Sequence, residues 1–223
     1  MLMLLFPPER KSTALDSRLR GNDEKGKLPM NKVVLASSNS GKLEEFQQLL
    51  GNCGFEVLPQ SDFNVPDAIE DGLSFVENSI IKARHASRLT GLPAIADDSG
   101  LEVDALNGQP GIYSARFSGE GATDQRNNAK LLAELKNTPE AERTARFQCL
   151  LVFLRHETDP TPVICQGTWD GRILFEEQGE NGFGYDPLFW VPDQNCSSAE
   201  LAPELKNQIS HRGKAMQLLL ARC

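Results

Sequence analysis

The chain has 223 residues, of which 39% are hydrophobic, and it carries a formal net charge of −8 at pH 7. A chain of this length can bury one sizeable core, and we expect a single domain. The negative charge argues against non-specific nucleic-acid binding, which depends on a broad basic face. A polyphosphate ligand is compatible with it, because such a ligand needs only a local cluster of Lys and Arg with a divalent cation.

Targeting and metal signals are weak along the chain. No apolar stretch reaches the ~18 residues of a membrane span, and the apolar run at residues 1–6 lacks the length and the basic region of a signal peptide. A cytoplasmic location is therefore the default expectation. The five cysteines and three histidines show neither a Cys-x-x-Cys pair nor a zinc-binding spacing, so we expect reduced, packed thiols.

Apolar runs and helical spacing divide the chain into alternating elements. Residues 1–29 are rich in Arg, Lys, Ser, Asp and Gly and show little apolar periodicity after Phe6. We expect them to be a disordered N-terminal extension outside the fold, with residues 30–223 forming the single domain. The patterns predict, in order, a strand at 33–36, a helix at 43–50, a strand at 55–58, a helix at 74–90, a strand at 92–96 and a helix at 123–135. Strands follow at 145–154, 163–168 and 172–175, the last two separated by an Asp170-Gly171 turn, and a helix capped by Ser210 runs to residue 220. This order predicts an α/β fold with a mixed sheet.

The strand at 92–96 runs directly into two adjacent carboxylates, Asp97 and Asp98. Burying a carboxylate is costly unless it is paired or bound to a cation, so this strand end predicts a Mg²⁺ ligand or a general base. The alternative is a simple turn, because Asp-Asp-Ser-Gly is good turn chemistry.

Two polar loops have features of ligand contacts. The segment Ser37-Ser38-Asn39-Ser40-Gly41-Lys42 lies between the first strand and its helix, where backbone N–H groups can hold phosphate oxygens and Lys42 adds a charge. It lacks the Walker A spacing, and ordinary helix caps with a surface lysine are the alternative.

The segment Asn181-Gly182-Phe183-Gly184-Tyr185-Asp186-Pro187 places two aromatic rings between glycines. Such a loop can bring Phe183 or Tyr185 against a nucleobase, and Asp186 can accept a hydrogen bond from the edge of the base. A hairpin corner is the alternative.

The start of the last helix gathers donors: Lys206, Ser210, His211, Arg212 and Gly213. Free N–H groups at a helix N-terminus favour acceptors, and a purine carbonyl would suit this set. The alternative is strongest for Lys206, since a lone lysine on a helix is usually solvated.

The helix at 74–90 and the acidic residues before it supply the remaining candidates. Asn78 and Lys82 are four residues apart and share a helix face, which makes Lys82 a candidate phosphate contact. Glu70 is a candidate metal ligand, with Asp71 as the neighbouring option. Glu77 fits a capping box with Ser74 better than it fits a ligand site.

Together, these motifs resemble the inosine/xanthosine triphosphate pyrophosphatase family, the Ham1-like enzymes that remove non-standard purine nucleoside triphosphates. The resemblance runs from about residue 32 to residue 222. It rests on the motifs 37–42, 74–78, 96–100, 108–116, 181–187 and 210–213, which occur in this order. The resemblance implies an elongated, twisted mixed sheet flanked by helices, with two lobes, a central nucleotide cleft and a homodimer.

The resemblance also implies an activity: hydrolysis of ITP, dITP and XTP between the α- and β-phosphates, with Mg²⁺ and no covalent intermediate. Asp98 would be the general base or a metal ligand, and Glu70 a further ligand. The residues implied around the substrate are Ser37, Ser38, Asn39, Ser40, Gly41, Lys42, Lys82, Ser99, Phe183, Gly184, Tyr185, Asp186, Lys206, His211 and Arg212.

Base selectivity would follow from hydrogen bonding. Hypoxanthine and xanthine carry a carbonyl at position six that accepts from Arg212 or His211, whereas the adenine amino group would leave those donors unpaired. Two other functions compete with this interpretation. A Maf-like pyrophosphatase is disfavoured by the 181–187 and 210–213 motifs, and a non-catalytic nucleotide-binding module would not need Asp98 beside a second carboxylate.

The proposed extension gives a first prediction. We expect a chain that begins at Met30 to fold and to keep full activity, because residues 1–29 show no pattern of a packed segment. Comparison of its thermal unfolding and turnover with those of the full chain checks this, and lost activity would refute it.

Overall fold

The computed structural model describes residues 31–51 and 54–222, so the expected extension at 1–29 lies outside the described residues. The described strands are β1 Asn31–Leu35, β2 Phe55–Pro59, β3 Ala94–Val103, β4 Thr144–Leu154, β5 Val163–Ile173, β6 Phe189–Val191 and β7 Cys196–Ser197. They form one sheet in the order β2-β1-β3-β4-β5-β6-β7. β1 pairs in parallel with β2 and β3, and the other pairs are antiparallel. The predicted mixed sheet is confirmed.

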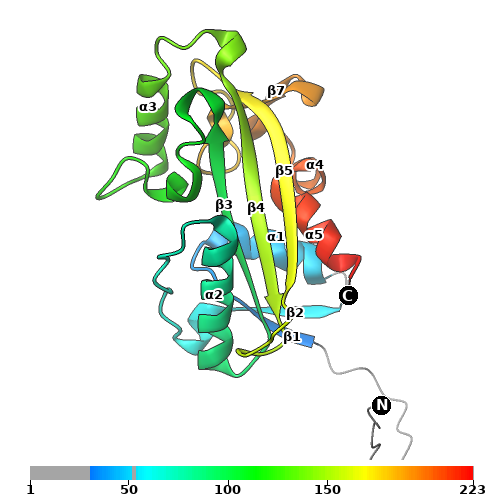
Figure 1. The fold of residues 1–223 in the computed structure, drawn as a ribbon. Helices are drawn as coiled ribbons and strands as arrows, with labels where there is room; N and C mark the ends of the chain where they lie inside the picture. Colours follow the sequence, from blue (N-terminus) through cyan, green and yellow to red (C-terminus); the bar gives the residue numbers. More distant parts are fainter. Residues whose placement is uncertain (1–30, 52–53, 223) are drawn as a thin grey trace, which may run out of the picture.

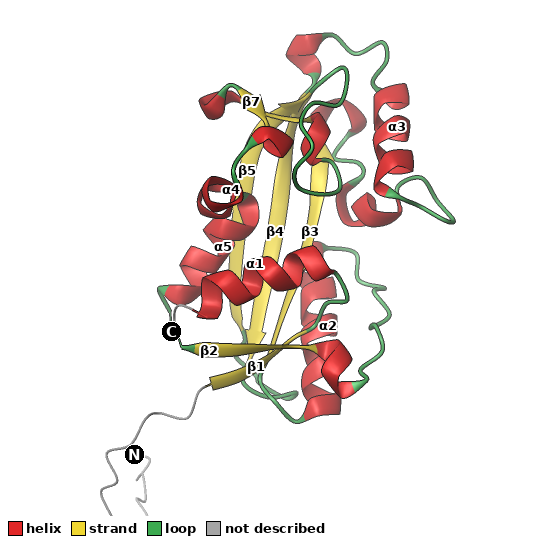
Figure 2. Ribbon diagram, turned by 180° about the vertical axis from the view of Figure 1, so that it is seen from behind, coloured by secondary structure: helices red, strands yellow, loops and turns green. Residues whose placement is uncertain are grey.

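The helices are α1 Ser40–Gly51, α2 Phe75–Thr90, α3 Asp124–Glu134, α4 Pro203–Ile209 and α5 His211–Leu220. The long strands β3, β4 and β5 run the length of the molecule, with α2 on one face and α1, α4 and α5 on the other (Figures 1 and 2). α3 stands beside the end of the sheet farthest from β1 and β2, so the elongated molecule has two lobes. Among the described helices, none is both long and apolar enough to cross a membrane.

Helix ends follow the local sequence signals. The Ser74 side chain accepts a hydrogen bond from the Glu77 N–H, and the Glu77 carboxylate accepts from the Ser74 hydroxyl and from the Leu73 N–H. Glu77 is thus a cap residue, as predicted. Ser210 caps α5 by accepting from the Gly213 N–H. These contacts satisfy N–H groups that a helix leaves free in its first turn.

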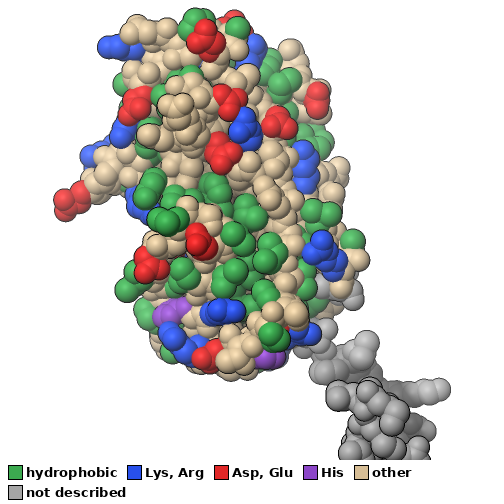
Figure 3. All heavy atoms as spheres, viewed as in Figure 1, with side chains coloured by type: hydrophobic (Ala, Val, Ile, Leu, Met, Phe, Trp, Pro, Cys, Tyr) green, Lys and Arg blue, Asp and Glu red, His purple; other side chains and the backbone are tan. Residues whose placement is uncertain are grey.

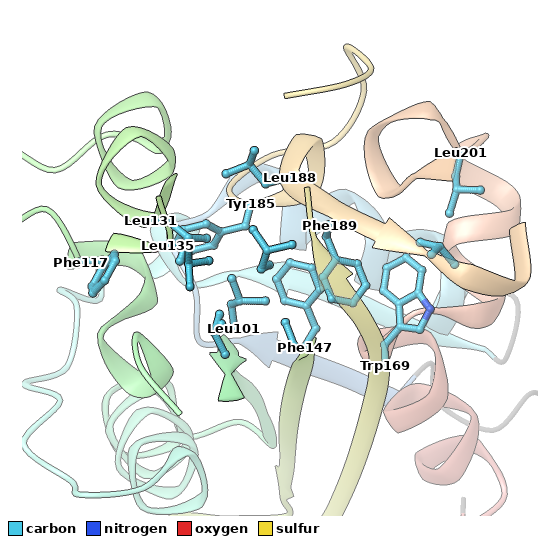
Figure 4. Close-up of a cluster of buried hydrophobic side chains, with 14 residues drawn as sticks. Leu101, Phe117, Leu131, Leu135, Phe147, Trp169, Tyr185, Leu188, Phe189 and Leu201 are labelled. Atoms are coloured by element: carbon cyan, nitrogen blue, oxygen red, sulfur yellow. The ribbon is translucent and has the colours of Figure 1, made fainter. Parts of the chain in front are cut away.

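Buried side chains form separate clusters on the two faces and in the two lobes. One cluster joins the sheet to α1 and α5, and a second fills the space beneath α2. A third cluster, drawn in Figure 4, packs Leu101, Phe147, Trp169 and Phe189 against residues of α3 and the chain after β5. The rings of Phe147 and Phe189 lie 4.6 Å apart, centroid to centroid. This third core supports the lobe that carries the aromatic loop.

The predicted turn at Asp170-Gly171 is wrong, because β5 runs unbroken from Val163 to Ile173. Asp170 pairs with Arg146 and Gly171 with Ala145 in the ladder to β4. A Cβ added at Gly171 would lie 2.4 Å from the Trp190 carbonyl oxygen. The glycine permits close approach of β6, which sequence alone cannot separate from a turn.

The acidic pair does not end its strand. β3 continues through Asp97 and Asp98 to Val103, so the expected strand end at Ala96 and the alternative turn are both wrong. The pairing between β1 and β3 does stop, at Leu35 and Ile95. The two aspartates therefore follow the point where β3 loses one neighbouring strand.

The surface is mixed in charge. On the face shown in Figure 3, acidic and basic side chains are interspersed around hydrophobic ones at mid-height. This pattern agrees with the net charge of −8, and it directs attention to local clusters of cations.

Candidate functional site

The described residues enclose a cavity of about 390 Å³ that receives side chains from both lobes. The loop before α1 and the helix α2 line it from one lobe, and the start of α3 lines it from the other (Figure 1). The predicted site residues that line it are Ser37, Ser38, Asn39, Lys42, Glu70, Lys82, Asp98, Ser99, Phe183, Gly184, Tyr185, Asp186, Lys206, His211 and Arg212. Of the predicted set, Ser40 and Gly41 are the two outside this lining.

Asp97 is the most constrained charge of the site. Its side chain is buried within β3, 1% exposed. The Lys42 ammonium lies 3.1 Å from Oδ1, and the Arg212 Nε and Nη2 atoms donate to Oδ2 at 3.2 Å. The Ser99 hydroxyl also donates to Oδ2, at 2.8 Å. Asp97 therefore ties Lys42 of α1 and Arg212, in the first turn of α5, to the strand β3.

The charge state of Asp97 follows from these partners. Burial alone would raise the pKa of its carboxyl, but Lys42 and Arg212 outweigh burial and hold that pKa far below its usual range. The carboxylate stays ionised at any physiological pH. It stabilises its cations without being free to take up a proton.

Asp98 points to the other face of the sheet, because successive strand residues alternate. Lys82 donates to its Oδ1 at 2.9 Å, and the Asn78 amide donates to its Oδ2 at 3.2 Å. Asn78 and Lys82 are one helical turn apart on α2, as their spacing predicts. Burial would lower the pKa of Lys82, but the charge of Asp98, with those of Asp97 and Glu70, raises it. Lys82 therefore stays protonated, and it lines the cavity.

The two aspartates thus do not form one two-carboxylate site. The second carboxylate near Asp98 is that of Glu70, whose Oε2 lies 3.5 Å from the Lys82 ammonium. Asp71 is exposed and does not line the cavity. Between the two acids that the sequence left open, the structure brings Glu70 to the site.

The donor set beside Lys82 suits a hard divalent cation. Asp98 and Glu70 both pair with the Lys82 ammonium, so the two carboxylates lie near one another. Within residues 31–51 and 54–222, no group of three or more Asp, Glu, His or Cys side chains could enclose a metal. Mg²⁺ is usually held by one or two carboxylates together with phosphate oxygens and water, so the residues present fit it.

The loop at 37–42 both caps α1 and faces the cavity. The Asn39 side-chain oxygen accepts from the Lys42 N–H at 3.0 Å, as an N-cap does. Lys42 is not a free surface lysine, because its ammonium lies against buried Asp97. Gly41 faces the aromatic loop: a Cβ added there would lie 3.3 Å from a ring carbon of Phe183.

Asp186 organises the aromatic loop. Its carboxylate is buried and accepts from the Phe183 N–H at 2.8 Å, the Ser198 hydroxyl at 2.8 Å and the Lys206 ammonium at 2.6 Å. Both carboxylate oxygens of Asp186, which we expected to accept from the edge of a base, therefore already accept from protein donors. The alternative of a solvated Lys206 is wrong, since this lysine is buried and its ammonium lies 5.0 Å from the centre of the Phe183 ring.

The first turn of α5 presents His211 and Arg212 to the cavity. The His211 ring stacks on Phe147, with ring centres 4.8 Å apart. Burial, together with the charges of Arg212 and Lys206, lowers the pKa of His211, so its imidazole is neutral. Its Nδ1 is buried without a hydrogen-bond partner in the described part of the chain. Arg212 is bound by Asp97 and Glu45, which fixes the direction of its remaining donors.

Several cavity residues lie between the motifs and are not predicted from the sequence: Gln60, Asp67, Asp124, Asn127 and Phe147. Gln60 donates to Asp67 at 2.6 Å, and the Ser38 hydroxyl also donates to Asp67. The sequence signal for two of these residues is weak: Asp124 and Asn127 lie at the start of α3, where Asp and Asn are also common as ordinary helix caps.

A model described as the Ham1 family matches residues 33–222 of the chain. A dITP/XTP pyrophosphatase from Vibrio parahaemolyticus serotype O3:K6 is 64% identical over 192 residues, which are 86% of this chain and 96% of that protein. One from Escherichia coli O157:H7 is 57% identical over 191 residues, covering 86% and 97%.

Solved structures give the same result. The structure of a HAM1 protein from Coxiella burnetii superposes with a TM-score of 0.81 at 50% identity, over 86% of this chain and 98% of that one. A nucleoside-triphosphatase / dITP/XTP pyrophosphatase from Mycobacterium abscessus has a TM-score of 0.68 at 42% identity, over 85% and 98%.

Gly167 on β5 provides a test of how the site is positioned. A Cβ added there would lie 2.0 Å from the His211 carbonyl oxygen, so Gly167→Ala must displace the first turn of α5. We expect a loss of about 1–3 kcal/mol in the free energy of unfolding, as for other overpacked positions, measured by urea denaturation. Gly51→Ala is the control: among the described residues, no atom outside its chain neighbours and its own helix backbone lies within 4 Å of the added Cβ. Equal stability of both variants would contradict the close packing of α5 on β5.

Proposed function

Because the chain belongs to the Ham1 family, we propose that it hydrolyses the deaminated purine nucleoside triphosphates ITP, dITP and XTP to the monophosphate and pyrophosphate. It is thereby a hydrolase of nucleotide metabolism, a nucleoside-triphosphate pyrophosphatase that removes these compounds from the nucleotide pool. The proposal rests on one observation: the same cavity is lined by lysines that pair with carboxylates, by the Phe183 ring and by the buried donors of the first turn of α5.

The phosphate half of the cavity is built from Lys42, Lys82 and the N-terminus of α1. Each lysine is held by a carboxylate, Lys42 by Asp97 and Lys82 by Asp98. Such prior pairing keeps the ammonium groups at fixed places, so they can meet a triphosphate without ordering long side chains. The polar residues Ser37, Ser38 and Asn39, which precede α1 and line the cavity, add further groups that can bind phosphate oxygens.

Membership of the family implies a divalent cation, and we propose Mg²⁺ held by Asp98 and Glu70. When bound, the cation neutralises charge on the phosphates during in-line attack by water. We assign Asp98 as the general base, because its carboxylate lines the cavity beside Lys82. Asn78 and Lys82 hold that carboxylate in orientation.

The base half is built around Phe183, whose ring offers a stacking surface. His211 and Arg212 supply donors for the carbonyl at purine position six. Arg212 gives Nε, Nη1 and Nη2 contacts to Asp97 and Glu45, and its other N–H groups are left for a ligand. An adenine amino group in this place would leave donors unpaired, which costs affinity.

Further features of the proposal rest on the family resemblance. We propose that residues 30–223 act as a single domain, that the protein works as a homodimer, and that it acts in the cytoplasm, where nucleoside triphosphates are used. Nucleic acid is not among the proposed ligands, in keeping with a net charge of −8.

The function is tested by incubating the purified protein and Mg²⁺ separately with ITP, XTP, GTP and ATP. We expect monophosphate and pyrophosphate from ITP and XTP, with little product from GTP and ATP, resolved by ion-exchange chromatography. Diphosphate with orthophosphate would instead indicate a γ-phosphatase, and no product from any nucleotide would favour a binding module.

Asp98→Asn tests the catalytic assignment. We expect kcat to fall about 100- to 10 000-fold, the usual contribution of general-base catalysis, while nucleotide binding measured by calorimetry is largely kept. The control is Asp193→Asn, the same change at an exposed residue outside the cavity lining. Turnover that survives in Asp98→Asn would refute both the base and the metal assignment.

A further inference from the structure

We propose that α3, which carries none of the sequence motifs, belongs to the base-recognition machinery, and that Asp124 and Asn128 are its positioning residues. They hold the base loop, defined as Phe183–Asp186, in the geometry that stacks Phe183 on a purine. The inference rests on the proposed function, because it assigns a task to the same cavity.

The helix α3 binds both backbone polar groups of one loop residue, Gly184. The Gly184 N–H donates to Asp124 Oδ2 at 2.7 Å, and the Asn128 amide donates to the Gly184 carbonyl oxygen at 3.1 Å. Positions 124 and 128 are one helical turn apart and share a face of α3. Gly184 has a φ of +63°, which L side chains rarely adopt and which turns both of its polar groups toward the helix.

Neither side chain has an ordinary helical role. The cap of α3 is Thr123, whose side chain accepts from the Arg126 N–H, so Asp124 is not needed as the cap. Asn128 is 3% exposed, and burying an amide is costly unless it is bonded. It donates to Glu177 Oε1 at 2.9 Å as well as to Gly184, so it joins two parts of the segment that follows β5.

Neighbouring contacts complete the support of the base loop. The Tyr185 hydroxyl donates to the Ser114 carbonyl oxygen at 2.8 Å, and the Asn127 amide of α3 donates to the same oxygen at 3.3 Å. On the other side, Lys206 of α4 holds the loop by donating to the Asp186 carboxylate. The Phe183 ring therefore lies between a support from α3 and a support from α4.

The far end of α3 is also anchored. Arg143 is 1% exposed and donates to the carbonyl oxygens of Leu135, Ile173 and Leu174 at 2.8, 2.9 and 2.7 Å. This joins the C-terminal end of α3 to the end of β5, where the segment leading to the base loop begins. A helix fixed at this end can hold a loop in place at its other end.

The phosphate half of the cavity has no such dependence. The hydrogen bonds and ion pairs of Lys42, Lys82 and Asp98 come from α1, α2, β3 and the Glu70 loop, and none of those described involves α3. Loss of the α3 contacts should weaken recognition through the base and leave recognition through the phosphates unchanged.

The test uses Asp124→Ala and Asn128→Ala, with Gln125→Ala as the control because Gln125 is exposed in the same turn. We expect each of the first two changes to raise KM for ITP and Kd for inosine monophosphate about tenfold, with kcat within about twofold. Kd for inorganic pyrophosphate, measured by calorimetry, should be unchanged. Asp124→Asn should recover most of the affinity, since its amide oxygen can still accept from Gly184.

Hydrogen exchange of residues 181–186 should become faster in both alanine variants and not in Gln125→Ala. Equal weakening of inosine monophosphate and pyrophosphate, or unchanged affinity for both, would overturn the proposal. Asn128 does not line the cavity, so an effect confined to Asp124→Ala would mean direct contact with the ligand and would also overturn it. A wild-type chain that binds inosine monophosphate without hydrolysing ITP would refute the proposed function alone, whereas one that binds no inosine monophosphate would refute this inference too.

Discussion

A buried carboxylate that must be matched by positive charge is the constraint on which the site depends. Asp97 sits inside β3 at 1% exposure, and an uncompensated charge there would cost several kcal/mol. Lys42 and Arg212 supply the compensation, one from α1 and one from α5. The ion cluster thereby joins α1 and α5, the helices that carry the proposed phosphate contact and the proposed base donors, to the same strand. Gly167 allows the approach of α5 that this arrangement needs.

The next residue on the strand performs a different task because it points to the other face. Asp98 is held by Asn78 and Lys82 of α2 and faces the cavity, where Glu70 joins it. The two adjacent acids thus have different surroundings: Asp97 pairs with Lys42 and Arg212 inside the fold, whereas Asp98 lines the cavity and is our proposed general base. The pairing of β1 with β3 has ended by this point, which leaves room for a ligand beside the strand.

The cavity shows how an acidic protein can hold a polyanion. Its lysines are paired with carboxylates and are already oriented before a phosphate arrives, so local binding does not require a basic protein overall. The same kind of pairing is found beside the aromatic loop, where Asp186 holds the Lys206 ammonium near the Phe183 ring. Positive groups on both sides of the cavity are thus held in place by neighbouring carboxylates.

Local signals in the sequence determined the helix caps at Ser74 and Ser210, the order of the longer elements from β1 to β4, and most of the residues that gather in the cavity. They did not reveal β6, β7 or α4. Such features depend on residues close together in the chain, so they can be read from the sequence directly. The tertiary structure alone decided that Asp97 and Asp98 face opposite ways inside a continuous β3, that Lys206 is buried, that β5 runs through Asp170, and that α3 holds the base loop. Each of these depends on a partner far away in the chain, because a buried charge or a glycine has the same local pattern whether the fold brings it a partner or leaves it in a turn.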